Sequence, residues 1–195
     1  MFVLKLFVLP LIIGFGLLGG MQETEPVVIN TNSFQVDPVH STAIFKVHHL
    51  GAGMFYGRFN DITGTINAND NSPSFDISID VNSVDTNSAK LDGHLKSPDF
   101  FNAVEFPTMT FKSSSSKKIG DEKYEVVGDI TIHGVTKPLT VLMAKTGQVN
   151  GRRGEMIGFE TEFVITRSEF GMMYGVEGGA LSDDIKVILS LEAGR

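Results

Sequence analysis

Apolar and polar residues alternate along most of the chain from Phe34 onward, in stretches separated by Gly, Asn, Asp and Ser. The clearest stretch is 74–82, where every second residue from Phe75 to Val81 is apolar. A period of two places alternate side chains on opposite faces of a β-strand, so this pattern predicts strands with one buried face. The predicted strands span residues 41–50, 54–67, 74–82, 107–114, 123–133, 138–148, 156–166 and 184–193.

Polar segments that favour turns connect several of these strands, at 67–73, 115–121, 133–136 and 148–154. Strands with one buried face that are joined by hairpins are typical of antiparallel sheets, and eight of them can close into a barrel. Closure also removes the exposed edges that long hydrophobic strands otherwise present. The pattern therefore predicts an all-β protein, an eight-stranded antiparallel barrel.

Two segments do not follow the alternation. Residues 87–105 lack it, and within them Ala89 to Lys96 can form a short helix that ends before Pro98. Residues 167–183 are rich in Gly and also carry adaptable apolar side chains. Long loops of this composition often cover an opening, so we expect this segment to border one end of the barrel.

The first twenty residues differ from the rest of the chain. Lys5 is their only charge, and the apolar run of 6–18 is followed by Gly19 and Gly20. This is typical of a secretory signal peptide, because a membrane-spanning helix needs roughly 20 apolar residues. We predict a signal peptide at 1–20, a flexible leader at 21–32 and the barrel at 33–195, in a periplasmic or secreted protein. The alternative of an uncleaved membrane anchor stays open, because the residues before the expected cleavage site fit the small-x-small pattern of signal peptidase sites poorly.

Composition narrows the chemistry of the chain. It contains no Cys, which excludes disulfides, a thiol nucleophile, a thiolate metal site and a lipid-modified N-terminal Cys. It has 16 basic and 23 acidic residues and a net charge of −7. Nucleic acids and anionic membrane surfaces are both bound largely through Lys and Arg, so an acidic chain disfavours both as partners.

The histidines do not form a metal-binding pattern. His48 and His49 are adjacent, so on a strand they point to opposite faces and cannot readily share a metal ion. We predict no metal site, and expect His49, His94 and His133 to fix turns and the contact between helix and barrel. No G-x-S-x-G element or Gly-rich phosphate loop follows a predicted strand, so we predict no catalytic residue.

Several segments, by their residues and by their order along the chain, closely resemble the YceI-like family of polyisoprenoid-binding, lipocalin-like proteins of bacterial periplasms. These segments are Asp37-Pro38-x-His40-Ser41, Gly57-Arg58-Phe59, Val84-Asp85-Thr86 through Asp99-Phe100-Phe101, Gly128-Asp129-Ile130 through Thr136-Lys137-Pro138, and Arg167-x-x-Phe170-Gly171. The resemblance implies a lipocalin-like barrel with a short helical insertion near 87–105. It also implies an isoprenoid chain in an apolar internal tunnel and no cofactor besides this bound lipid.

We expect the tunnel to be lined by inward-facing apolar residues and by the 167–183 loop. The predicted ligand-binding residues are Phe45, Val47, Phe59, Ile77, Ile79, Phe111, Ile130, Val141, Met143, Phe159, Phe163, Phe170, Met173, Val187 and Leu189. A polyprenyl phosphate needs cations and an isoprenoid quinone needs neutral donors, so the head-group candidates are Arg58, Arg167 and Tyr174. Ligand uptake through the end bordered by the loop would involve transient membrane contact for lipid exchange.

Two other functions stay open. Eight-stranded barrels are near the size at which side chains either fill the interior or leave room for one small ligand. The chain can therefore be a structural or partner-binding exported barrel that needs no ligand. A barrel can also carry an enzyme that acts on an isoprenoid. The sequence indicates no oligomeric state.

Overall fold

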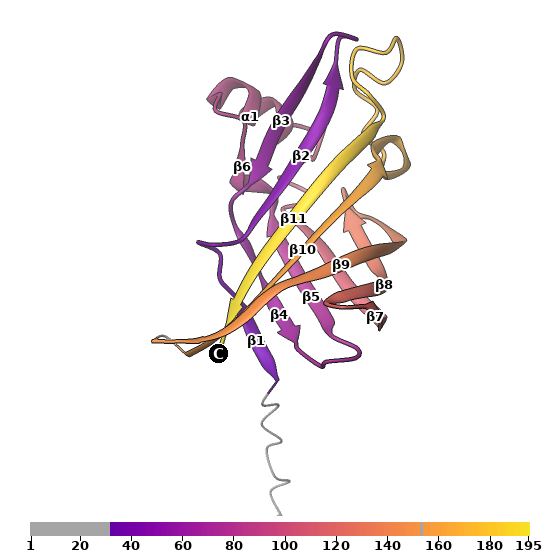
Figure 1. Cartoon of the computed structure of the whole chain (residues 1–195). Coiled ribbons are helices and arrows are strands. Elements are labelled where there is room, and N and C mark those ends of the chain that lie inside the picture. Colours follow the sequence, from indigo (N-terminus) through magenta and orange to yellow (C-terminus); the bar gives the residue numbers. More distant parts are fainter. Residues whose placement is uncertain (1–31, 153) are drawn as a thin grey trace, which may run out of the picture. The chain divides into compact units, whose positions relative to one another are not determined.

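Eight antiparallel strands form the predicted barrel, and three of them are interrupted (Figure 1). The computed structural model describes residues 32–152 and 154–195. The interrupted strands are β1 (Ser33–Val36) with β2 (Thr42–His49), β3 (Gly53–Phe59) with β4 (Ile62–Asn67), and β5 (Ser74–Asp80) with β6 (Val84–Asp85). The continuous strands are β7 (Thr108–Gly120), β8 (Lys123–Ile132), β9 (Val135–Gly151), β10 (Gly154–Thr166) and β11 (Asp184–Gly194). The predicted signal peptide, and the predicted leader before Asn32, lie outside the described residues.

Each strand pairs with its neighbour in the chain, and the last strand closes the ring. Along β11, residues near its C-terminal end pair with β1, where Gly194 lies opposite Gln35. Further along, β11 pairs with β2, where Ser190 lies opposite Thr42. Its other edge pairs with β10 over its whole length. This closure confirms the predicted barrel, in which most strand edges are paired. The pairing of β10 with β9 ends at Glu160, so residues 161–166 of β10 pair with β11 alone.

The strand boundaries differ from the prediction at two positions, between β3 and β4 and at the end of β7. The predicted strand 54–67 is broken between β3 and β4, where the backbone N–H of Asn60 donates to the carbonyl oxygen of Ser83, 3.3 Å away, instead of to a ladder partner. In contrast, the predicted turn at 115–121 is wrong. β7 continues to Gly120 because its polar residues form a ladder with β8, and only Asp121 and Glu122 make the turn.

Three short helical segments connect strands of the barrel within the described residues. Helix α1 (Ala89–Leu95) confirms the predicted helix and ends before Pro98. The hydroxyl of Thr86 donates to the carboxylate of Asp92, 2.6 Å away, and so joins the preceding segment to the helix. The 3₁₀ turns are η1 (Val81–Ser83) and η2 (Arg167–Phe170). Across the described ranges, no helix combines the length and the apolar character that a membrane crossing requires.

The barrel interior is filled in one half. Phe75 and Phe159 meet edge to face, with 5.1 Å between ring centroids, and the Tyr124 ring lies 6.3 Å from Phe159. We call these three residues the aromatic plug. Their side chains are at most 3% exposed, and other fully buried residues of the barrel surround them. The plug therefore closes the barrel between the cavity described below and the end near the C-terminus.

Candidate ligand-binding site

The other half of the barrel is hollow. A cavity of about 630 Å³ lies there, within the range of roughly 300–1,000 Å³ that small-molecule sites occupy. Alternate residues of β10 and β11 show how the strands supply its wall: Thr161, Phe163 and Ile165 from β10, and Ile185, Val187 and Leu189 from β11. The next inward residues along the same strands, Phe159 and Leu191, are almost fully buried and belong to the filled half. The boundary between the filled half and the cavity thus lies between Phe159 and Thr161 on β10 and between Leu191 and Leu189 on β11.

Most of the predicted ligand-binding residues line this cavity. They are Phe45, Val47, Phe59, Ile77, Ile79, Phe111, Ile130, Val141, Met143, Phe163, Val187 and Leu189. Three others do not line it. Phe159 belongs to the aromatic plug, Phe170 is buried in η2, and the Met173 side chain is 55% exposed on the loop surface.

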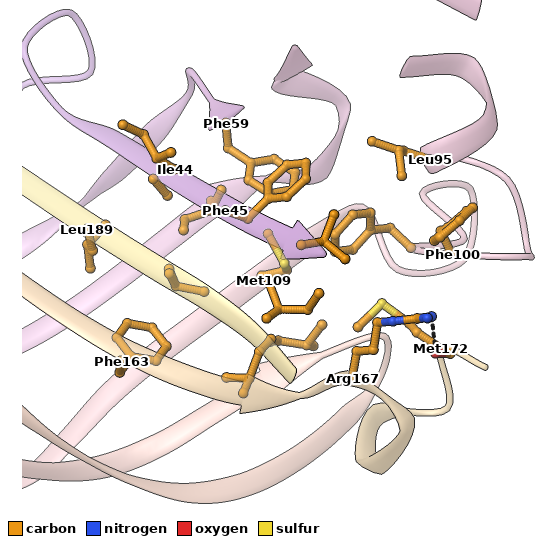
Figure 2. Close-up of a pocket in the computed structure, with 18 of the residues that line it drawn as sticks. Ile44, Phe45, Phe59, Leu95, Phe100, Met109, Phe163, Arg167, Met172 and Leu189 are labelled. Carbon is orange, nitrogen blue, oxygen red and sulfur yellow. Dashed lines mark hydrogen bonds between the residues drawn. The ribbon is translucent and has the colours of Figure 1, made fainter. Parts of the chain in front are cut away.

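Other cavity residues were not among the named ligand-binding candidates, and several of them come from α1 and the segment after it. These residues include Leu91, His94, Leu95, Phe100, Phe101, Met109, Met172 and Leu181. Leu91 and Leu95 are spaced four apart on the predicted helix, so they share one face, and this apolar pair could have indicated that the helix covers the barrel end. Figure 2 shows Phe100 and Met172 at one end of the pocket and Leu189 at the other.

Among the described residues that line the cavity, Arg167 carries a permanent charge. Its side chain is only 4% exposed, and its guanidinium donates to the carbonyl oxygens of Met172, Ser182 and Leu181 at 2.8, 3.0 and 3.4 Å. Burial lowers the pKa of Arg167, whereas the nearby Asp183 raises it. A guanidinium keeps its proton in proteins, so a positive charge lies at the cavity wall.

The charge of Arg167 is not neutralised by a direct ion pair with any residue in the described ranges. Asp183, the nearby carboxylate, instead accepts hydrogen bonds from the hydroxyl and the backbone N–H of Ser168, at 2.6 and 2.8 Å. These two bonds lower the pKa of Asp183, and Arg167 adds a smaller effect in the same direction. Three of the five guanidinium N–H groups donate to these carbonyl oxygens, which leaves two that can donate to an anion.

Three rings join α1 to the 171–183 loop over the cavity. The His94 ring contacts Phe100 and Tyr174 edge to face, each at 5.0 Å between centroids, and Phe100 lies 5.1 Å from Tyr174. All three residues also line the cavity. Nε2 of His94 lies 3.1 Å from a carboxylate oxygen of Asp99. This places His94 between helix and loop.

His133 anchors the same loop from the β8–β9 turn. Its Nδ1 lies 2.9 Å from the carbonyl oxygen of Phe170, so the ring donates from this nitrogen. The Phe106 ring packs against it at 4.9 Å, and Nε2 is buried without a hydrogen-bond partner among the described atoms. The contact ties the end of η2, where the loop begins, to the barrel rim.

The two remaining head-group candidates lie in different places. Tyr174 lines the cavity and is 49% exposed, so it stands at the mouth. Arg58 lies on the outer face of β3, where its side chain pairs with Asp85 at 3.2 Å and does not line the cavity. The structure therefore brings Arg167 and Tyr174 to the cavity but not Arg58.

A second cavity lies on the other side of the aromatic plug. Its volume is about 320 Å³, and Tyr124 and Phe159 contribute to its wall. Polar residues, including Asp70, Lys145 and Arg195, line much of the remainder. Lys145 pairs with Glu122 at 3.8 Å, and Arg195 pairs with Glu155, so both cations have carboxylate partners.

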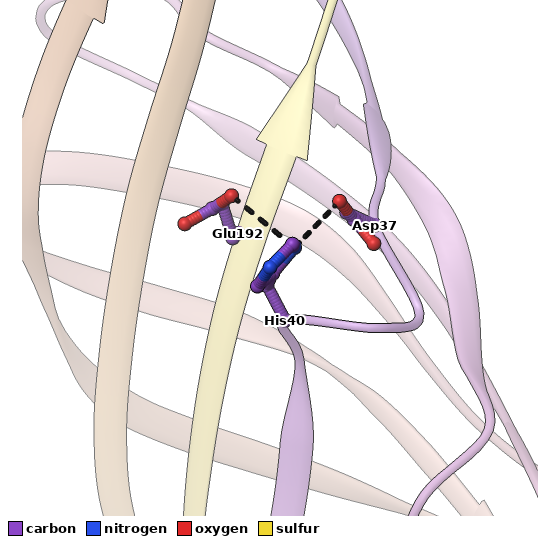
Figure 3. Close-up of side chains that lie close together, drawn as sticks. All are labelled: Asp37, His40 and Glu192. Carbon is purple, nitrogen blue, oxygen red and sulfur yellow. Dashed lines mark hydrogen bonds and ion pairs between the residues drawn. The ribbon is translucent and has the colours of Figure 1, made fainter.

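Side chains of metal-ligating types gather at the seam between the first and last strands (Figure 3). Asp37, His40 and Glu192 bring their ligand atoms within 4.8 Å of one another. Nδ1 of His40 lies 2.8 Å from an oxygen of Asp37 and 3.7 Å from one of Glu192. None of the three lines the cavity. The cluster fits an ion-pair network that holds the 37–41 connection against β11.

Comparison with known proteins gives the family. The model of the YceI-like domain matches residues 34–193. Protein YceI of Salmonella arizonae is 36% identical over 185 residues, which cover 93% of this chain and 95% of that protein. The crystal structure of the Campylobacter jejuni YCEI protein aligns with a TM-score of 0.68 and 34% identity, over 76% of this chain and 89% of that one.

A more distant structure shares the fold alone. It is described as a polyisoprenoid binding domain from Saccharophagus degradans implicated in plant cell wall breakdown. It aligns with a TM-score of 0.65 at 15% identity, over 83% of this chain and 97% of that chain. The barrel, the match over residues 34–193 and the sequence identity to YceI proteins lead to one conclusion: this chain belongs to the YceI-like family.

Proposed function

We propose that this protein is an exported, periplasmic or secreted, binding protein that sequesters or carries an isoprenoid-type amphiphilic lipid. The observation that carries the proposal is the cavity of about 630 Å³, whose wall is almost entirely apolar. Such a wall offers an apolar chain a gain of about 0.8 kcal/mol per methylene relative to water. The relative from Saccharophagus degradans, described as polyisoprenoid binding, supports the choice of an isoprenoid tail.

A bilayer offers an apolar chain nearly the same gain as the cavity does. Binding selectivity must therefore come from the shape of the cavity and from the head group. Affinity relative to a membrane is then modest, which suits exchange with membranes. A carrier or a buffer fits these energetics better than a trap does.

Arg167 supports an anionic head group, such as that of a polyprenyl phosphate. Its charge lies at the wall near Phe100 and Met172, at one end of the pocket (Figure 2). Charge-assisted hydrogen bonds to a phosphate are stronger than those to a neutral quinone oxygen. Tyr174, at the mouth, offers a hydroxyl donor to either head group. We therefore favour a lipid whose tail points toward Leu189 and whose head lies near Arg167.

Two features favour binding over the other functions considered. A barrel without a ligand needs a filled interior, and only the half around the aromatic plug is filled. An enzyme acting on the lipid needs a reactive acid or base beside it, and none of the described cavity-lining residues is Asp or Glu. The two histidines that line the cavity lie in its cover: His49 bridges to Leu181 of the loop, and His94 contacts Asp99 and Tyr174. We propose that the protein binds its ligand without changing it.

The proposal is tested by uptake of a fluorescent polyprenyl phosphate by purified protein. Val187→Asp puts a carboxylate into the cavity wall, whereas Val164→Asp makes the same change at an exposed position of the neighbouring strand. We expect uptake by the wild type and by Val164→Asp. Val187→Asp should lose uptake while its circular dichroism spectrum still shows the β-sheet signal of the folded protein. No uptake by the wild type, or equal uptake by both variants, would overturn the proposal.

A further inference from the structure

Three large apolar side chains are exposed on the β2–β3 hairpin. Leu50, at its tip, is 66% exposed, and Met54 and Tyr56 on β3 are each 53% exposed. Single exposed apolar residues are common, but a group of them next to a cavity indicates an interaction site. Leu50 also lines the cavity, so the exposed surface of the hairpin is continuous with the cavity wall.

The charge of this hairpin differs from that of the rest of the chain. Residues 38–60 contain no Asp or Glu, although the chain has 23 acidic residues. Lys46 lies opposite Tyr56 in the ladder, with Nζ 5.6 Å from the centre of the ring. Lys46 makes no ion pair with a carboxylate of the described ranges, whereas Arg58 is neutralised by Asp85. The hairpin thus combines exposed apolar side chains with a lysine and lacks carboxylates, on an acidic protein.

The hairpin and the 171–183 loop share one end of the barrel (Figure 1). The backbone N–H of Leu50 donates to the carbonyl oxygen of Ala180 at 2.7 Å, and His49 forms a β-bridge with Leu181. Tyr174 of this loop is exposed and lines the cavity. A flat surface that touches the hairpin tip would therefore lie beside the mouth of the cavity.

From these observations we propose that the β2–β3 hairpin docks the protein onto an anionic lipid bilayer, with the cavity mouth facing the membrane. Exposed apolar side chains beside Lys are the combination by which peripheral proteins bind an interface, and Tyr suits the head-group layer because its ring is amphipathic. The acidic remainder of the chain is repelled by such a surface, so it orients the hairpin toward it. The inference rests on the proposed function, since a lipid carrier must collect its ligand from a membrane.

The absence of Trp from the chain allows a clean local probe of this contact. Met54→Trp places a single Trp on the hairpin, and Val149→Trp places one on β9 at a side chain that is 57% exposed. The test adds vesicles of phosphatidylcholine containing a minority of phosphatidylglycerol, with and without brominated lipid. We expect a blue shift and bromine quenching at position 54 only.

Both reporter proteins carry the same N-terminal segment, so membrane attachment by that segment alone would affect both alike. Equal signals at the two positions, or none at either, would overturn the docking proposal. A blue shift at position 54 that grows with protein concentration in the absence of vesicles would also overturn it, because the hairpin would then contact a second copy of the chain.

A second experiment separates docking from binding. Met54→Ser with Tyr56→Ser removes apolar surface outside the cavity, and Leu142→Ser with Val149→Ser is the matched control on β9. Losing two interfacial side chains should weaken vesicle partition by about tenfold or more, and higher salt should weaken wild-type partition as well. Uptake of polyprenyl phosphate from vesicles should slow in the hairpin variant only, while uptake from detergent solution stays unchanged.

The two proposals fail in different ways. If the wild type takes up no lipid from detergent solution, the proposed function is overturned. If it does so, but the hairpin variant takes up lipid from vesicles as fast as the wild type, docking by the hairpin is overturned and binding stands.

Discussion

Nη1 of Arg167 donates a 2.8 Å hydrogen bond to the carbonyl oxygen of Met172, and both residues line the cavity. The same guanidinium holds the carbonyls of Leu181 and Ser182, at the other end of the loop. One buried cation therefore gathers both ends of the 171–183 loop and supplies positive charge to the binding site. A bound anion and the loop carbonyls would share its N–H groups.

Arg167→Gln tests the head-group role of this charge. Removing a charge-assisted hydrogen bond costs roughly 1.5–3 kcal/mol, so the affinity for a polyprenyl phosphate should fall by about tenfold or more. The affinity for an isoprenoid quinone, measured in the same fluorescence titration, should fall much less. Arg167→Lys keeps the charge and should retain part of the preference for phosphate.

Arg58→Gln is the matched control, because it removes the same type of side chain from the outer face of β3. It should leave both affinities unchanged. An equal loss for phosphate and quinone in Arg167→Gln would mean that Arg167 only positions the loop, and an unchanged phosphate affinity would place the head group elsewhere.

The aromatic plug should set the length of the cavity. Phe159→Ala removes a fully buried ring between Phe75 and Tyr124, so it should lower the free energy of unfolding by about 3–5 kcal/mol. It should also let longer isoprenoid chains bind. Phe163→Ala, four residues along β10 in the cavity wall, should cost less stability because its side chain already borders empty space. Urea unfolding and a chain-length series measure both effects; equal stability losses and an unchanged length preference would contradict this role.

Gly57 controls the position of the Phe45 ring. A Cβ at Gly57 would overlap the tip of this ring, which lines the cavity. The ring can move, so Gly57→Ala should push it into the cavity and reduce lipid uptake more than it reduces stability. Gly53→Ala on the same strand meets no atom within 4 Å and serves as control. Uptake by Gly57→Ala at the level of Gly53→Ala would show that the cavity tolerates the shift.

Stability should fall at low pH through specific carboxylates. The pKa of Asp37 is lowered mainly by its hydrogen bond to His40, and that of Asp183 by hydrogen bonds from Ser168. A carboxyl group whose pKa is lower in the folded state stabilises the fold above its unfolded pKa. This contribution is lost as the pH falls below the ordinary value of 3.8 toward the lowered one.

Asp183→Asn should therefore flatten the acid limb of the stability curve, measured by urea unfolding at a series of pH values. Asp76→Asn, at an exposed residue of β5, is the control. An acid limb as steep in Asp183→Asn as in the control would contradict this assignment.

The barrel could be predicted from the sequence because a period of two assigns each strand its inner face. The same parity shows why Arg58 was a poor head-group candidate: Gly57 and Phe59 face inward, so the residue between them faces outward. The hollow and the filled half could not be told apart in this way. Phe159 and Phe163 have the same parity on β10, and only the convergence of Phe75 and Tyr124 from other strands decides which of the two is plugged.

The cover of the cavity was only partly predictable. The sequence indicated a loop at 167–183 and a helix near 89–96, but neither showed alternation that would fix which side chains point inward. Contacts between these segments depend on chain closure around the barrel. His94 and Tyr174 are 80 positions apart in the sequence, and only the folded chain brings their rings within 5.0 Å.

Native mass spectrometry of the protein purified from its own cell envelope, followed by organic extraction, tests the central claim most directly. We predict a stoichiometric adduct whose extract contains an isoprenoid lipid, with a phosphate-bearing head group if Arg167 has the role proposed for it. A mass without adduct, together with no uptake when polyprenyl phosphates and isoprenoid quinones are offered, would contradict the lipid-binding function and leave the barrel without a ligand.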